Sequence, residues 1–166
     1  MVVWHVLAIL AVQALSSGRA AILGYTMPIF SALWGVAMFG ERLRPRHVAG
    51  VVAAGVGVSL LLWHEFASIV GRPLAAFGML VAAALWGLGT QQMRRTRIAA
   101  PTLAIVFWMT ALSTVVMSAA TFLVERDRWQ LPGAATTAAI AYNAVLIFGL
   151  AQPVWLILAR NLPPIA

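Results

Sequence analysis

The side chains best suited to chemistry are the few polar or ionisable groups inside long uncharged runs of the chain. His5 is the only ionisable side chain in the first of these runs, residues 1–18. A helix rises about 1.5 Å per residue, so His5 would lie roughly 18 Å from the far end of this run, near the middle of a bilayer. Ionisable groups at such a depth are costly and often functional. His5 is therefore a candidate for a binding pocket or for proton transfer, with a packed or interfacial histidine as the alternative.

A second set of candidate side chains lies well inside later runs. Trp34 and Trp86 are distant from the ends of their runs, whereas tryptophans that anchor a membrane belt lie at the ends. Gln91 follows Trp86 by five residues, so the two side chains share roughly one face of an expected helix. This pattern makes all three candidates to line a cavity, and a hydrogen bond between helices explains Gln91 equally well.

Polar residues also lie within the last run. Tyr142 and Asn143 are adjacent in its outer half, and Gln152 precedes Pro153 further along. Asn143 and Gln152 are nine residues apart, about two and a half turns, so they would point to opposite sides of a straight helix. Pro153 is expected to kink the helix and change that relation. Tyr142 and Asn143 are therefore further candidates for ligand contact, with hydrogen bonding between helices as the alternative.

Recognisable catalytic and metal-binding patterns are missing from the sequence. The chain contains no cysteine. It has no HExxH or GxSxG motif, no paired carboxylates within a run, and no His, Asp and Glu at metal-ligand spacing. Its glycine-rich stretches lack the preceding strand and the lysine of a nucleotide-binding loop. The sequence therefore predicts no enzyme, no metal ion and no cofactor.

The composition of the chain indicates lipid rather than water as its main surroundings. Of 166 residues, 63% are hydrophobic and only 9% are charged, whereas a soluble domain carries about 25% charged residues. The formal net charge is +7, but the arginines lie in short breaks between apolar runs, where they indicate membrane topology. We therefore expect the lipid bilayer, and no nucleic acid, as a partner.

Six uncharged runs predict six transmembrane helices. A helix needs about 20 apolar residues to cross the hydrocarbon core, and the runs lack the polar alternation of membrane strands. Backbone groups in lipid must be satisfied within the segment, which favours helices. The expected fold class is an all-α integral membrane protein, with helices over residues 1–18, 20–40, 48–63, 73–93, 98–124 and 131–159.

The arginines also predict the orientation of these helices. Alternate breaks carry seven and four arginines, and the richer side is expected to face the cytoplasm. The richer set consists of Arg42, Arg44, Arg46, Arg94, Arg95, Arg97 and Arg160.

The most distinctive pattern of the chain is GYTMPIFSALWGVAMFGERL at residues 24–43, followed by the glycine-rich run HVAGVVAAGVGVSLLLW at residues 47–63. It resembles the EamA-type transporters of the drug/metabolite transporter superfamily. In that family a repeat ends with a Tyr/Thr-x-Pro helix, a Gly-Glu-Arg-Leu turn and a glycine-rich helix. The matching positions are Tyr25, Thr26, Pro28, Gly40, Glu41, Leu43, Gly50, Gly55 and Gly57.

The resemblance implies a bundle of ten helices in two inverted five-helix repeats, of which this chain would contain helices three to eight. Residues 1–64 would be the last three helices of the first repeat, and residues 73–166 the first three of the second. Residues 65–72 would form an extracytoplasmic linker. The sequence is therefore expected to be part of a longer protein.

The function implied by the resemblance is secondary transport across the bacterial inner (plasma) membrane. Export of small organic metabolites such as amino acids, by alternating access, is the expected activity. Pro28 is expected to provide a hinge or to free a polar backbone group, and Glu41 to pair with a neighbouring arginine at the cytoplasmic face. The expected substrate-binding residues are His5, Tyr25, Pro28, Trp34, Trp86, Gln91, Tyr142 and Asn143.

Other functions are left open by the sequence. A small multidrug-type exporter that works as an oligomer is one, and assembly as a homodimer is open too. A non-transporting membrane scaffold and a degenerate transporter fragment are the others. A transporter predicts flux in vesicles that is lost when a cavity side chain is blocked, whereas a scaffold predicts no flux and a stable complex with a partner protein.

Overall fold

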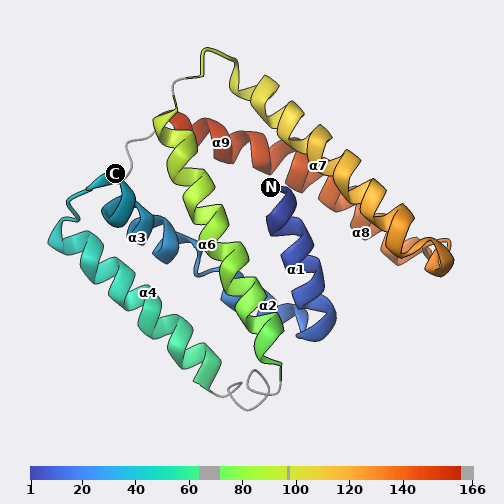
Figure 1. Ribbon diagram of the computed structural model, residues 1–166, viewed down its shortest axis with the longest axis horizontal. Coiled ribbons are helices and arrows are strands. Elements are labelled where there is room, and N and C mark those ends of the chain that lie inside the picture. The colour runs from blue at the N-terminus through green and yellow to red at the C-terminus, as the bar shows by residue number, and fades with distance from the viewer. Residues whose placement is uncertain (64–71, 97, 162–166) are drawn as a thin grey trace. The chain divides into compact units, whose positions relative to one another are not determined.

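The computed structural model describes residues 1–63, 72–96 and 98–161, and every regular element within these ranges is helical (Figure 1). The predicted all-helical class is therefore confirmed. In chain order the elements are α1 (Val2–Ala14), α2 (Ser17–Gly24), α3 (Met27–Phe39), α4 (Pro45–Trp63), α6 (Pro73–Arg95), α7 (Thr102–Val124), the 3-10 turn η1 (Arg126–Arg128), α8 (Ala134–Tyr142), the π-helix η2 (Asn143–Ala151) and α9 (Gln152–Asn161).

Four helical segments of the described chain are long and apolar enough to cross a membrane. They cover Ser17–Phe39, Pro73–Arg95, Thr102–Val124 and Ala134–Asn161. Two shorter apolar helices, Val2–Ala14 and Pro45–Leu61, occupy the other two predicted runs. The chain is thus a multi-pass helical membrane protein, with apolar helices at the positions that the sequence predicts.

The first helix is shorter than its uncharged run predicts. The run continues to Gly18, but α1 ends at Ala14 and the chain turns at Ser16 before α2 begins. Ser16 has an extended backbone (φ −64°, ψ 152°), and serine and glycine disfavour a helix interior. The 13 residues of α1 span roughly 20 Å, less than the ~30 Å hydrocarbon core.

Two compact units divide the described chain. The first contains α1 to α4 and α6, and the second contains α7, η1, α8, η2 and α9. Of the predicted linker at residues 65–72, all but Arg72 lies outside the described residues. The proposed repeat boundaries therefore stay predictions.

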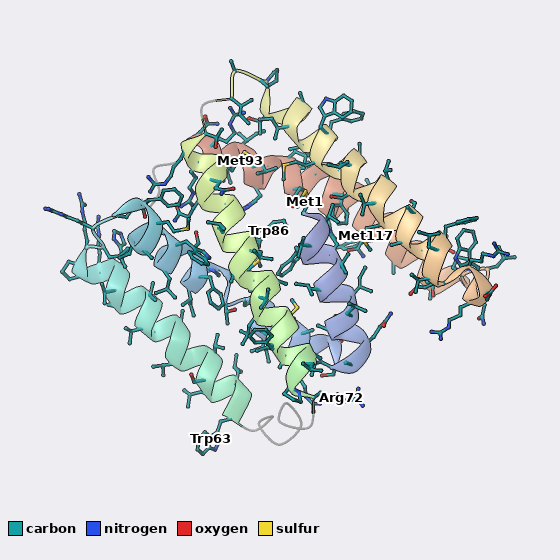
Figure 2. All side chains as sticks on the ribbon, viewed as in Figure 1. Met1, Trp63, Arg72, Trp86, Met93 and Met117 are labelled. Carbon is teal, nitrogen blue, oxygen red and sulfur yellow. The ribbon has the colours of Figure 1, made fainter. Side chains whose placement is uncertain are left out.

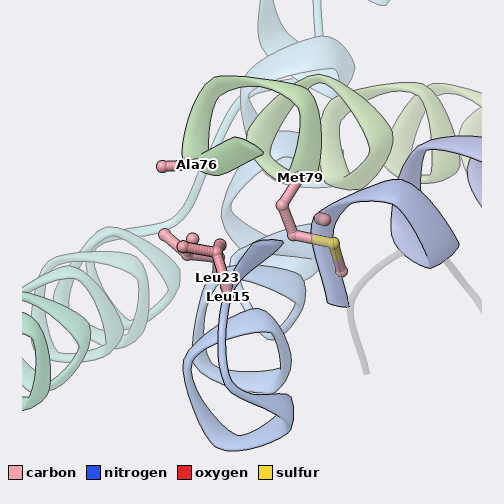
Figure 3. Packing of buried hydrophobic residues seen from close by; sticks show 5 residues of the cluster. Leu15, Leu23, Ala76 and Met79 are labelled. Atoms are coloured by element: carbon pink, nitrogen blue, oxygen red, sulfur yellow. The ribbon is translucent and has the colours of Figure 1, made fainter. Parts of the chain in front are cut away.

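The core of the first unit lies where α1, α2 and α6 meet (Figure 3). Its buried members are Ala11 of α1, Leu15 just after α1, Leu23 of α2, and Ala76 and Met79 of α6. Lipid is as apolar as these side chains, so close packing rather than expulsion of water holds such helices together. Because α6 contributes to this cluster at its beginning, it connects the first two helices of the unit.

Arg72 joins the ends of α1 and α6. Its guanidinium Nη1 donates a hydrogen bond to the carbonyl of Ala14, the last residue of α1. The last carbonyls of a helix have no partner within the helix, and a cation is favourable beside them. This contact therefore satisfies a polar group that α1 alone leaves open.

α3 and α6 pack with their backbones in close contact. A Cβ added at Gly87 of α6 would lie 2.8 Å from the backbone nitrogen of Ser31 and 3.1 Å from the carbonyl oxygen of Met27. Small residues permit such an approach between membrane helices. Ala83 and Gln91, one turn before and one turn after Gly87, are buried as well. One face of α6 is thus built to receive α3.

In the second unit, Arg160 of α9 holds the segment that leads into α7. Its Nη1 donates to the carbonyl of Ala100 at 3.1 Å and to the hydroxyl of Thr102 at 2.8 Å. Its Nη2 donates to the carbonyl of Ile98 at 3.1 Å. The forked guanidinium suits several acceptors at once, so this arginine ties α9 to the start of α7 besides its predicted role in topology.

The last predicted helix changes its winding along its length. α8 passes into the nine-residue π-helix η2, and α9 then begins at Gln152. Pro153 has no N–H to donate to the carbonyl of Gly149, and its ring clashes with that carbonyl in a regular α-helix. A wider turn avoids this clash, because π-helical bonds reach one residue further back. The helix therefore widens just before Pro153, where the sequence predicts a kink.

Candidate functional site

The helix predicted over residues 20–40 is interrupted in its first half. α2 ends at Gly24, and α3 follows after a two-residue turn formed by Tyr25 and Thr26. Pro28 lies in the first turn of α3, where its missing N–H costs α3 no hydrogen bond. The same missing N–H means that Pro28 cannot bond to the carbonyl of Gly24, four residues earlier. Pro28 is therefore the sequence feature that explains the break.

Thr26 closes this break on its buried side. Its hydroxyl donates to the carbonyl of Leu23 at 2.6 Å, and its backbone N–H approaches the same carbonyl at 3.2 Å. Thr26 is buried, whereas Tyr25 is 73% exposed and Pro28 is exposed. Both predicted site residues of the break are thus exposed in this structure and take no part in the core of the unit.

The predicted tryptophans both contact their neighbours within the first unit. The indole N–H of Trp34 on α3 donates to the carbonyl of Ala84 on α6 at 2.9 Å. Trp86 of α6 (Figure 2) packs against Trp4 of α1, with ring centroids 5.4 Å apart and planes tilted by 54°. Their polar and aromatic groups are therefore used for contacts between helices in this conformation. His5, which follows Trp4 on α1, is partly buried.

Gln91 is the most deeply buried of the predicted site residues, with 2% of its surface exposed. Its amide nitrogen donates to the carbonyl of Ser31 on α3 at 2.8 Å. Its amide oxygen is buried and has no hydrogen-bond donor in the described structure. A buried acceptor without a donor costs free energy. Gln91 therefore joins α3 to α6 through its amide nitrogen, while its amide oxygen stays unsatisfied in the described structure.

Glu41 lies just beyond the end of α3 and pairs with Arg95 at the end of α6. Glu41 thus pairs with an arginine as predicted, but the partner lies 54 residues away and is not one of the arginines next to it in the sequence. The guanidinium of Arg95 also lies over the ring of Phe39, 4.2 Å from its centroid. A cation over an aromatic face is attracted by the ring. The ends of α3 and α6 are thus joined by one arginine that contacts two side chains of the other segment.

Tyr142 and Asn143 lie in the second unit, at the passage from α8 to η2. Both are exposed in this structure. The amide nitrogen of Asn143 donates to the carbonyl of Ala139, one turn earlier, at 2.9 Å. This bond is local to the helix, in contrast to the bond of Gln91, which joins two helices.

Within the first unit, the structure brings together residues that the sequence did not single out. Ser31 and Gly35 of α3 face Gln91, and a Cβ added at Gly35 would lie 3.1 Å from its amide nitrogen. Their spacing of four residues, like that of Gly87 and Gln91, marks one face of a helix. Small or polar residues repeated at this spacing are the signal by which they could have been found. In the described ranges, no three His, Cys, Asp or Glu side chains lie close enough to hold a metal ion.

Together, these features define a multi-pass helical membrane protein with an interrupted helix and a partly polar contact between α3 and α6. Residues 1–63 match the sequence model of the EamA-like transporter family. This match confirms the resemblance predicted from residues 24–63, for the first 63 residues of the chain. The chain matches no curated protein and no solved structure.

Proposed function

We propose that this chain acts in the export of small organic metabolites, such as amino acids, by alternating access in the bacterial inner membrane. The observation that carries the proposal is the interrupted helix Ser17–Phe39, within the residues that match the transporter family. Discontinuous membrane helices typically form the substrate sites of secondary transporters, because their open backbone groups can contact polar ligands.

The break between α2 and α3 suits a hinge. The Tyr25–Thr26 turn can change its backbone angles without breaking a bond to Pro28, since the proline has no N–H. Hinges of transporters and enzymes are often a few residues at the end of an element. In this proposal, α3 moves relative to α2 and exposes the face of α6 that carries Gly87 and Gln91.

Gln91 is the residue proposed to recognise the substrate. Its buried amide oxygen has no donor in the described structure, so an ammonium or hydroxyl group of a metabolite would satisfy it. Hydrogen bonds to a charged donor are stronger than neutral ones. Trp34 and Trp86 would border the same space with apolar surface once the contact between α3 and α6 opens. The amine of an amino acid fits this chemistry.

The test is counterflow in vesicles that contain the purified chain, with a radiolabelled mixture of neutral amino acids as the probe. We expect uptake above that of empty vesicles, and a loss of about tenfold or more in Gln91→Leu, because the buried acceptor then disappears. Gln13→Leu is the matched control, since Gln13 is an exposed glutamine on α1.

Two results would contradict the proposal. If the vesicles show no counterflow, transport of this substrate class by the chain fails, and the scaffold alternative gains support. If Gln13→Leu reduces counterflow as strongly as Gln91→Leu, the loss of counterflow is not specific to Gln91. Gln91 then has no special role in substrate recognition.

A further inference from the structure

The contact between α3 and α6 changes in character along its length. At its middle, the backbone of α3 lies close to Gly87, because a Cβ added there would lie 2.8 Å from the nitrogen of Ser31. Towards the ends of both helices the contact becomes polar, first through Gln91 and then through Glu41 and Arg95. The ring of Phe39 lies beneath the guanidinium of Arg95 in this region.

The backbone at the end of α3 fixes the position of Glu41. Gly40 has a left-handed conformation (φ 64°, ψ 26°) that ends the helix, and glycine adopts it without the strain that a side chain would add. The N–H of Glu41 then donates to the carbonyl of Gly35 at 3.0 Å. The chain is thus turned back, so that the carboxylate lies against its own helix.

The absence of a side chain at Gly35 makes room for this carboxylate. A Cβ at that position would collide with Oε2 of Glu41 and lie 3.1 Å from the amide nitrogen of Gln91. Only 14% of the Glu41 side chain is exposed, against 35% for Arg95. Glu41 therefore lies mostly buried beside Gly35 of α3, whereas the more exposed Arg95 contacts it from α6.

The carboxylate is only half satisfied in this arrangement. Oε1 accepts the bond from Arg95, while Oε2 is buried and has no donor in the described structure. Removing an ion pair from water is costly, and the cost is recovered only when the remaining polar atoms find partners. The unpaired Oε2 therefore offsets part of the attraction between Glu41 and Arg95.

We infer that Glu41 and Arg95, with Phe39 beneath the guanidinium, form a reversible latch that closes the α3–α6 contact at this end of the first unit. When the latch opens, the Oε2 of Glu41 and the amide of Gln91 become accessible to water and to ligands. The part that the latch plays in a transport cycle rests on the proposed function, whereas its opening does not depend on any substrate.

Opening can be measured directly, because the natural chain contains no cysteine. Spin labels on Met38→Cys and Gly89→Cys would report the distance between the ends of α3 and α6. Met38 is 56% exposed, and a Cβ at Gly89 meets no atom within 4 Å. In the full chain we expect Glu41→Gln and Arg95→Gln each to add a second population of molecules. In this population the distance between the two labels is longer by about 5 Å, the size of a one-turn helix shift.

A second label pair distinguishes opening from general loss of structure. Gly18→Cys on α2 and Gly78→Cys on α6 both lie where an added Cβ meets nothing within 4 Å. The distance between these two labels should stay unchanged in Glu41→Gln and Arg95→Gln. The double variant Glu41→Arg with Arg95→Glu exchanges the charges, and it should remove the population with the longer distance at the latch. As a matched control, Asp127→Asn neutralises an exposed carboxylate of the second unit and should leave both distances unchanged.

Two outcomes would overturn the latch. An unchanged distance at the latch in both single variants shows that the ion pair does not hold the helices. Equal changes in both label pairs show that the variants loosen the whole unit. For the transport cycle, Glu41→Cys with Arg95→Cys can be joined by a short bifunctional thiol reagent in the vesicles. Loss of counterflow on joining supports a role of the latch in transport. Full counterflow overturns that role alone and leaves the proposed transport intact.

Discussion

At the scale of single residues, glycine decides how closely α3 and α6 can approach. Gly87 lies against the backbone of α3, whereas Gly89, on the same helix, points into open space. A backbone cannot give way as the end of a flexible side chain can, so an added methyl group at Gly87 must push the helices apart. The two glycines thus differ in function although they are two residues apart in the same turn.

We predict that Gly87→Ala destabilises the protein by about 1–3 kcal/mol, the usual cost of an overpacked contact. Thermal or denaturant unfolding in detergent would measure the change. Gly89→Ala is the matched control and should be neutral or slightly stabilising, because alanine favours a helix over glycine. Equal stability of the two variants would contradict the close contact at Gly87.

At the scale of elements, Pro28 and Pro45 both lie near a helix start but have different consequences. Pro45 is the first residue of α4, where a proline costs little. Pro28 is also near a helix start, but only because the preceding helix ends at Gly24. Without Pro28, α2 and α3 have the length and composition of one continuous helix of 23 residues.

We predict that Pro28→Ala restores a hydrogen bond to the carbonyl of Gly24 and stiffens the break. Hydrogen exchange should show slower exchange around residues 25–28, by about tenfold, because local opening becomes harder. Counterflow should fall at the same time, since the proposed hinge is lost. Pro45→Ala serves as the control and should change neither quantity. Unchanged exchange at residues 25–28 in Pro28→Ala would contradict the explanation of the break.

The elements themselves were predictable from the sequence, and their contacts were not. The length of an uncharged run reflects the thickness of a bilayer, so the positions of the apolar helices follow from composition alone. The break could also be predicted from the sequence, because Pro28 cannot donate a hydrogen bond to the carbonyl of Gly24. The bond from Gln91 to Ser31 joins residues 60 positions apart, and the pair of Glu41 with Arg95 spans 54. Such pairs depend on the register of one helix against another, which no local pattern encodes.

At the scale of the whole molecule, the distribution of arginine predicts which side of the membrane each connection faces. Arg44, between α3 and α4, belongs to the side with more arginines, and Asp127, after α7, belongs to the other. Both side chains are exposed in the structure. The rule that positive residues stay inside therefore places Arg44 in the cytoplasm and Asp127 outside.

This orientation can be checked with single cysteines in the otherwise cysteine-free chain. A membrane-impermeant thiol reagent added to intact cells should label Asp127→Cys and leave Arg44→Cys unlabelled. After the membrane is permeabilised, both positions should react, which controls for accessibility. Labelling of Arg44→Cys alone in intact cells would reverse the predicted topology.

The central position of α6 in the first unit also matters during biosynthesis. The carbonyl of Ala14 receives its partner from Arg72, 58 residues later in the chain, and Leu15 and Leu23 complete their cluster only with Ala76 and Met79. The hydrogen bonds of Ser31 and Trp34 and the ion pair of Glu41 likewise need partners on α6, which is synthesised later. The earlier helices must therefore leave the ribosome and enter the bilayer with these groups unpaired. The nascent chain is exposed to mispairing and to membrane proteases until α6 has been inserted.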